Sequence, residues 1–103
     1  MANWVKFGKA STIGDGTVQG KDFGDVRVCV AKLNGTCYAI GDVCTHAEGY
    51  LSDGELIGEN VECPLHGAQF DVKTGAVKQM PATEPVATYP VKIEDDEIYV
   101  DLG

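Results

Sequence analysis

Hydrophobic and polar residues alternate in short runs along this chain, and glycines or prolines interrupt the runs roughly every eight to twelve residues. Stretches rich in β-branched and aromatic residues occupy positions 25–30, 37–40, 87–93 and 97–100. No segment of helical length places its apolar residues at the 3.6-residue period of an amphipathic helix. The pattern therefore predicts an all-β protein, an antiparallel β-sandwich or barrel.

The clearest turn signal is Asn34-Gly35, which lies between two strand-like runs. A two-residue type I′ turn there places Cys29 opposite Ile40 and Cys37 opposite Lys32. Because successive strand residues point to opposite faces, the two cysteines should then lie on different sides of the hairpin. We expect them to be small buried side chains that do not bond to each other.

Two further segments have simple structural interpretations. The acidic stretch Glu94–Glu97 separates the last two runs and predicts a solvated hairpin turn, being too short for a calcium-binding loop. Near the start of the chain, Trp4 and Phe7 are expected to pack a first strand onto the core.

The length and net charge of the chain narrow the range of possible functions. A chain of 103 residues is one domain, spanning 1–103. With 16 acidic and 8 basic side chains and a net charge of -8, nucleic acid and anionic membranes are unlikely partners. The first residues lack the basic and apolar regions of a signal peptide, so a cytoplasmic protein is expected.

The chemistry is concentrated in two short segments, Cys44-Thr45-His46 and Cys63-Pro64-Leu65-His66, with sixteen residues between His46 and Cys63. They contain both histidines of the protein. Two thiolates and two imidazoles could hold a structural zinc or an iron–sulfur centre. Mixed zinc sites usually pair like ligands, whereas here each segment supplies one cysteine and one histidine, an arrangement that suits a two-iron centre.

These segments resemble the Rieske [2Fe–2S] signature, C-x-H followed by C-x2-H and glycine. The similarity continues through Phe70-Asp71, Thr74-Gly75 and Met80–Ala82 to the C-terminus. The chain resembles a bacterial Rieske-type ferredoxin of aromatic-ring-hydroxylating dioxygenase systems. The resemblance implies a β base with a small cluster-binding subdomain, formed by two loops within about residues 42–82.

By the same resemblance, one [2Fe–2S] cluster is held by Cys44 and Cys63 on the buried iron and by His46 and His66 on the outer iron. The protein would then be a one-electron carrier rather than an enzyme. It would accept electrons from an NAD(P)H-dependent flavin reductase and pass them to a terminal oxygenase, acting as a soluble monomer. The alternatives are the small Rieske-like subunit of an NAD(P)H nitrite reductase and a zinc-stabilised interaction module.

Departures from the respiratory members of the family bear on the reduction potential. Gly49 and Leu65 stand where those proteins carry a disulfide, and Ala68 and Phe70 stand where they offer hydroxyl groups to the cluster region. Hydrogen bonds to the sulfurs favour the reduced cluster, so their loss lowers the potential. We expect a midpoint of about −150 mV, at the low end of the Rieske range.

Overall fold

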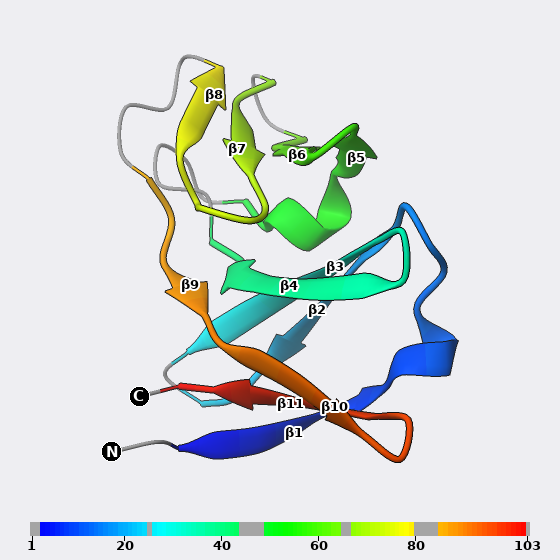
Figure 1. The fold of residues 1–103 in the computed structure, drawn as a ribbon. Coiled ribbons are helices and arrows are strands. Elements are labelled where there is room, and N and C mark those ends of the chain that lie inside the picture. Colours follow the sequence, from blue (N-terminus) through cyan, green and yellow to red (C-terminus); the bar gives the residue numbers. More distant parts are fainter. Residues whose placement is uncertain (1–2, 25, 44–48, 65–66, 80–84, 103) are drawn as a thin grey trace.

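The computed structural model describes residues 3–24, 26–43, 49–64, 67–79 and 85–102 (Figure 1). These residues form antiparallel strands and two short 3₁₀ turns, as the predicted all-β class requires. Within the described ranges, no helix is long or apolar enough to cross a membrane. Three sheets, here called the outer, middle and loop sheets, are stacked in that order from the bottom to the top of Figure 1.

The outer sheet has the strand order β1-β11-β10, with β1 at Trp4–Lys9, β10 at Val91–Glu94 and β11 at Glu97–Asp101. The middle sheet has the order β2-β3-β4-β9, with β2 at Val18–Asp22, β3 at Arg27–Leu33, β4 at Thr36–Gly41 and β9 at Thr88–Tyr89. The loop sheet has the order β5-β6-β7-β8, with β5 at Glu55–Ile57, β6 at Asn60–Glu62, β7 at Gln69–Asp71 and β8 at Val77–Gln79. The 3₁₀ turns are Ala10–Thr12, after β1, and Leu51–Asp53, before β5.

The β3–β4 hairpin has the predicted register, with Cys29 opposite Ile40 and Lys32 opposite Cys37. Its turn residues, Asn34-Gly35, have positive φ angles of 51° and 82°, as a type I′ turn demands. The turn chemistry therefore fixes which face each strand residue takes.

The middle sheet has a hydrophobic core on each of its faces. One core lies toward the loop sheet and contains Cys29 and Ala31 of β3. The other lies toward the outer sheet and contains Val28 and Val30 of the same strand, together with Cys37 of β4. Strand β3 is therefore buried on both sides, and the two cysteines lie on opposite faces, as predicted.

The prediction for the first strand is half right. Phe7 is buried, 4% exposed, but Trp4 is 37% exposed and does not pack into the core. The alternation of β1 explains the difference, because Val5 and Phe7 face the outer-sheet core and Trp4 is left on the opposite face. The Lys92 ammonium lies 4.6 Å from the centre of the Trp4 ring there.

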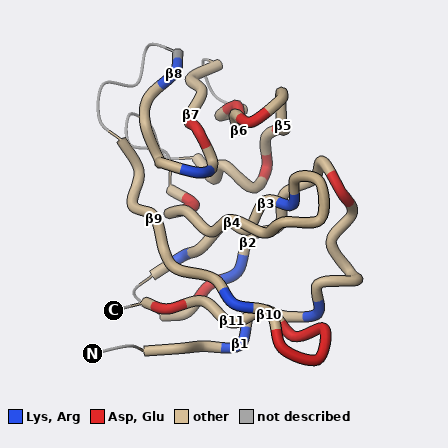
Figure 2. The backbone as a smooth tube through the Cα atoms, in the orientation of Figure 1, with Lys and Arg blue, Asp and Glu red and all other residues tan. Residues whose placement is uncertain are grey.

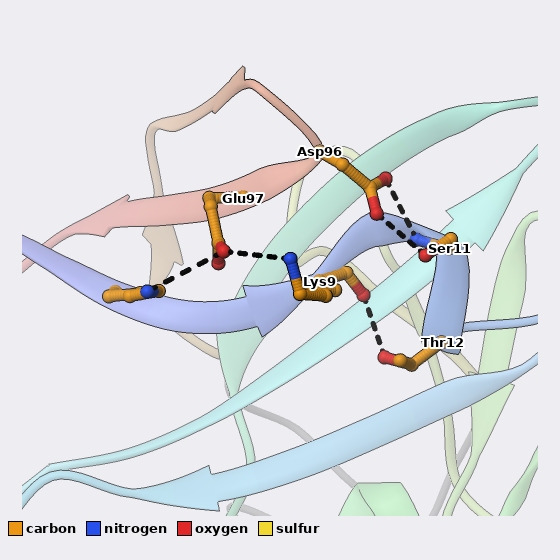
Figure 3. A network of polar contacts seen from close by, with 6 residues as sticks. Lys9, Ser11, Thr12, Asp96 and Glu97 are labelled. Atoms are coloured by element: carbon orange, nitrogen blue, oxygen red, sulfur yellow. Dashed lines mark hydrogen bonds and ion pairs between the residues drawn. The ribbon is translucent and has the colours of Figure 1, made fainter.

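The acidic turn predicted at Glu94–Glu97 joins β10 to β11, where it forms the continuous acidic loop of Figure 2. Glu94, Asp95 and Asp96 are exposed to solvent, as predicted, and the turn also makes specific polar contacts. The Asp96 carboxylate accepts hydrogen bonds from the Ser11 backbone N–H at 3.1 Å and from the Ser11 hydroxyl at 2.6 Å (Figure 3). Glu97 forms ion pairs with Lys6 and Lys9. The turn therefore ties β10 and β11 to the 3₁₀ turn that follows β1.

Candidate metal centre

Of the four predicted ligands, the structure describes one. Cys63 directly follows β6 and is 1% exposed, packed in the core between the middle and loop sheets. Its neighbours in that core include Leu51, Ala68 and Phe70. Cys44, His46 and His66 lie outside the described residues. A thiolate at Cys63 would therefore be an inner ligand, shielded from water.

The segment from Cys63 to Ala68, here called the second loop, connects β6 to β7. Its two ends are joined by a hydrogen bond of 2.6 Å from the Cys63 N–H to the Ala68 carbonyl oxygen. Gly67 has a φ of 75°, which glycine adopts at little energetic cost. The chain therefore turns back on itself between Cys63 and Ala68.

The segment from Val43 to Tyr50, here called the first loop, follows β4 and contains Cys44 and His46 in its sequence. Val43 and Tyr50 form an isolated antiparallel bridge at its base. One residue farther out, the Leu51 N–H donates to the Asp42 carbonyl oxygen at 2.7 Å. Both ends of the first loop are thus closed by backbone contacts, as in the second.

The exit of the first loop lies against the entry to the second. A Cβ atom added at Gly54 would meet the carbonyl oxygen of Glu62, which immediately precedes Cys63. The missing side chain at Gly54 is therefore what permits the 3₁₀ turn Leu51–Asp53 to lie against β6. A cavity of about 550 Å³ opens beside the first loop and is lined by Val43, Gly49, Tyr50 and Asp53.

The described surroundings suit a histidine- and cysteine-bound iron–sulfur cluster. Ala68 and Phe70 are completely buried next to Cys63 in the core, and neither side chain carries a hydroxyl group. A dry, apolar lining of this kind limits the access of solvent to a bound cluster and sets the local dielectric. Val43 and Tyr50 are 51% and 43% exposed, so apolar surface also reaches the solvent beside the first loop.

The cysteines of the hairpin have a different setting from that predicted for the ligands. Burial raises the pKa of the Cys29 thiol far above its ordinary value, and the nearby Asp42 carboxylate raises it further. Burial also raises the pKa of Cys37. Both thiols are therefore protonated at neutral pH and are poor metal ligands, which agrees with their predicted role as small core residues.

Sequence reasoning overlooked one residue beside the site. Asp42 lies two positions before Cys44 and is the single charged or polar residue among the fully buried side chains of the described chain. The available signal was an aspartate at the end of a strand whose other residues are largely apolar. That signal gave no indication of its partners, because they come from other elements.

Comparisons with known proteins agree with this picture. The family model described as the Rieske [2Fe–2S] domain matches residues 3–90. The ferredoxin component of the naphthalene 1,2-dioxygenase system of Pseudomonas putida is 38% identical over 100 residues, which are 97% of this chain and 96% of the relative.

Two solved structures are also similar. One is a complex of reduced oxygenase and oxidized ferredoxin in carbazole 1,9a-dioxygenase, with a TM-score of 0.90 and 35% identity over 95% of this chain and 92% of the matched chain. The other is a putative NADH-dependent nitrite reductase small subunit from Mycobacterium tuberculosis, with a TM-score of 0.88 over 100% of this chain and 97% of that chain. Its identity is 20%, so this second likeness is one of fold alone.

Proposed function

Because the chain belongs to the Rieske [2Fe–2S] domain family, we propose that Cys44, His46, Cys63 and His66 hold its cluster. The two cysteines bind the inner iron and the two histidines bind the outer iron. The burial of Cys63 at the end of β6 supports the inner assignment. On this basis residues 1–103 are one Rieske domain, with the cluster-binding loops inserted at about 42–82.

The protein carries a Rieske-type [2Fe–2S] cluster and is an electron-transfer component of an aromatic dioxygenase system, not an enzyme by itself. The cluster, when bound, takes up and releases one electron at a time. The chain's own residues close the bases of the two loops and keep water from Cys63. The single observation that carries this function is the full-length similarity to ferredoxin components.

The partner that receives the electron is a terminal oxygenase. The carbazole dioxygenase complex, in which a similar ferredoxin is bound to an oxygenase, supports this assignment. The donor is proposed to be an NAD(P)H-dependent flavin reductase. We further propose that the protein acts as a cytoplasmic monomer without a nucleic-acid or membrane partner, in keeping with its net charge of -8.

The small subunit of a nitrite reductase is the weaker alternative, because that likeness reaches only 20% identity. A shuttle and a fixed subunit differ in a simple way. Only a shuttle is purified as a monomer that transfers electrons, one per protein, from a reductase to an added aromatic-ring oxygenase. Size-exclusion chromatography with a reductase-coupled oxygenase assay separates the two functions.

The ligand assignment is tested with a matched pair of cysteine variants. We expect Cys63→Ala to abolish the brown colour and the EPR signal of the dithionite-reduced protein, because the inner iron loses a thiolate. Cys37→Ala, which alters a cysteine of the other core, should retain both. Iron, zinc and acid-labile sulfide are measured on the same samples. Stoichiometric zinc without sulfide in the wild type would overturn the proposal.

A further inference from the structure

We propose that Asp42 is a positioning residue that closes the first loop and anchors it to the middle sheet through Arg27 and Ser52. The inference rests on the proposed function, because it assigns the first loop two cluster ligands. Asp42 is completely buried at the point where the chain leaves β4. Its contacts extend both to the start of β3 and to the far end of the first loop.

The side chain of Asp42 joins these two places directly. One carboxylate oxygen, Oδ1, accepts a hydrogen bond of 2.6 Å from the Ser52 backbone N–H. The other, Oδ2, accepts 2.8 Å from the Ser52 hydroxyl and 2.7 Å from Arg27 Nε. Both oxygens are therefore occupied by donors that lie 15 and 10 residues away along the chain.

The backbone of Asp42 repeats the same connections. Its N–H donates to the Arg27 carbonyl oxygen at 3.0 Å, and its carbonyl oxygen accepts from the Leu51 N–H at 2.7 Å. Main chain and side chain thus bind the same two segments, so the residue cannot rotate without breaking several hydrogen bonds. We call this set of contacts, formed by Asp42, Arg27, Ser52 and Leu51, the Asp42 clamp.

A carboxylate with no exposed surface is stable only with compensating partners. Leaving a buried charge unpaired is strongly unfavourable, whereas hydrogen bonds to a charged group are among the stronger ones in proteins. Arg27 supplies the opposite charge and Ser52 supplies two donors. The arrangement has the features of a built site rather than of an incidental surface ion pair.

The neighbouring strand leaves room for the clamp. A Cβ atom added at Gly20 of β2 would collide with the Ser52 hydroxyl and approach Asp42 Oδ2 to 2.5 Å. Gly20 is not among the glycines with positive φ, so space rather than backbone conformation accounts for glycine at this position. On the other side, the Arg27 guanidinium carbon lies 4.1 Å from the centre of the Tyr50 ring.

The consequence is a first loop fixed at both ends. Asp42 holds the entry, Ser52 and Leu51 hold the exit, and Arg27 contacts both Asp42 and Tyr50. Ligands are positioned more accurately when a supporting shell fixes the segments that carry them.

The test compares two serine-to-alanine variants of the full-length protein carrying its cluster. Ser52→Ala removes a hydroxyl from the Asp42 clamp, and Ser11→Ala removes a similar hydroxyl from the exposed Asp96 turn. We expect Ser52→Ala to speed cluster loss, followed by visible absorbance, about tenfold and to shift or broaden the EPR signal. Ser11→Ala should leave both unchanged when the two variants are compared at equal distance below their unfolding temperatures.

A second pair of variants tests the role of the positive charge of Arg27. Arg27→Gln should reproduce the faster cluster loss, and Arg27→Lys should restore part of the wild-type rate because it keeps a cation beside Asp42. Equal cluster-loss rates and EPR spectra for Ser52→Ala and Ser11→Ala would overturn the clamp. If at the same time Cys63→Ala lost the cluster, the ligand assignment would stand and only the positioning role would fall.

Hydrogen exchange on the wild-type protein provides a readout that needs no variant. The Leu51 and Ser52 amides donate to Asp42 and should be protected to the same degree as amides of the β3–β4 hairpin. Exchange of these two amides at the rate of an unstructured chain would contradict the proposal even if every variant failed to fold.

Discussion

Two serine–aspartate contacts can be compared within this molecule, one beside the first loop and one at the β10–β11 turn. Asp42 bonds the N–H and hydroxyl of Ser52, and Asp96 bonds the N–H and hydroxyl of Ser11. The chemical groups are the same and the distances are similar. The surroundings differ, because Asp42 is fully buried and paired with Arg27 whereas the Ser11–Asp96 contact is exposed.

Burial decides what each contact can do. Water replaces a lost hydrogen bond at the exposed turn, so that contact contributes modestly to the fold. No water replaces it around a completely buried carboxylate, and the partners left behind remain unsatisfied. The exposed contact therefore joins the β10–β11 turn to the 3₁₀ turn after β1. The buried contact instead fixes the geometry of a loop that the sequence predicts to carry ligands.

The comparison is tested most severely by removing the two carboxylate charges. Asp42→Asn should lower the free energy of unfolding by about 3 kcal/mol, because it leaves Arg27 without its buried partner. Asp96→Asn should lower it by less than about 1 kcal/mol, and asparagine tolerates the positive φ of 66° found there. Denaturant titration of both variants measures the difference, and equal losses would show that burial is not decisive.

The packing beside the two loops can be compared with the packing of the outer sheet by adding a methyl group at one glycine in each place. Gly54→Ala forces a Cβ atom onto the Glu62 carbonyl oxygen and should cost about 2 kcal/mol, with incomplete cluster loading, because it separates the loops. Gly8→Ala in β1 meets no atom within 4 Å and should change stability by less than about 0.5 kcal/mol. Thermal unfolding and iron content report both effects. Full loading of Gly54→Ala would argue against close packing of the loops.

The apolar lining of the second loop predicts a redox effect. Ala68→Ser introduces a hydroxyl at a fully buried position near Cys63, and a hydrogen bond to sulfur would favour the reduced cluster. A gain of about 1–2 kcal/mol corresponds to a rise of roughly 40–90 mV in the one-electron midpoint. Protein-film voltammetry measures it, with Ala10→Ser in the other core as control. An unchanged or lower midpoint would contradict the proposed role of the lining.

The smallest expected effect concerns the contribution of the outer sheet to stability at acidic pH. The hydrogen bond from Lys9 is the main cause of the lowered pKa of Glu97, and the charge of Lys6 adds to it. A carboxylate whose folded pKa is lowered stabilises the fold above its unfolded pKa, and this contribution disappears as pH falls through the folded value. Glu97→Gln should therefore flatten the dependence of stability on pH below about 4.3, the ordinary glutamate pKa.

Urea titrations at several acidic pH values, followed by far-ultraviolet circular dichroism, measure this dependence. Glu94→Gln on the facing strand is the matched control. The same slope for Glu97→Gln and the wild type would show that the contacts with Lys6 and Lys9 make no contribution.

Local signals in the sequence predicted much of the middle and outer sheets. The Asn34-Gly35 turn fixed the register of β3 and β4, and the register fixed the faces of Cys29 and Cys37, because each step depends only on neighbouring residues. The exposure of Trp4 was not predictable in this way. It depends on which face of β1 meets the middle sheet, and a bulge between Lys6 and Gly8 further shifts the register with β11.

The candidate site, too, was predicted from the sequence only in part. The spacing of cysteines and histidines led to the family and its cofactor, and the burial of Cys63 agrees with its predicted place as an inner ligand. The assignments of all four ligands, Cys44, His46, Cys63 and His66, remain predictions. The Asp42 clamp could not be anticipated, because its members come from β3, the end of β4 and the 3₁₀ turn Leu51–Asp53, and only folding brings them together.

The double burial of β3 has a consequence for any attempt to shorten the protein. Since Val28 and Val30 face one core while Cys29 and Ala31 face the other, the middle sheet is a partition shared by both halves. Cutting away the outer sheet would expose one side of that partition to water and weaken the wall on which the first loop is built. We therefore expect a fragment without the outer sheet to be unstable, and the whole protein to melt in one cooperative transition.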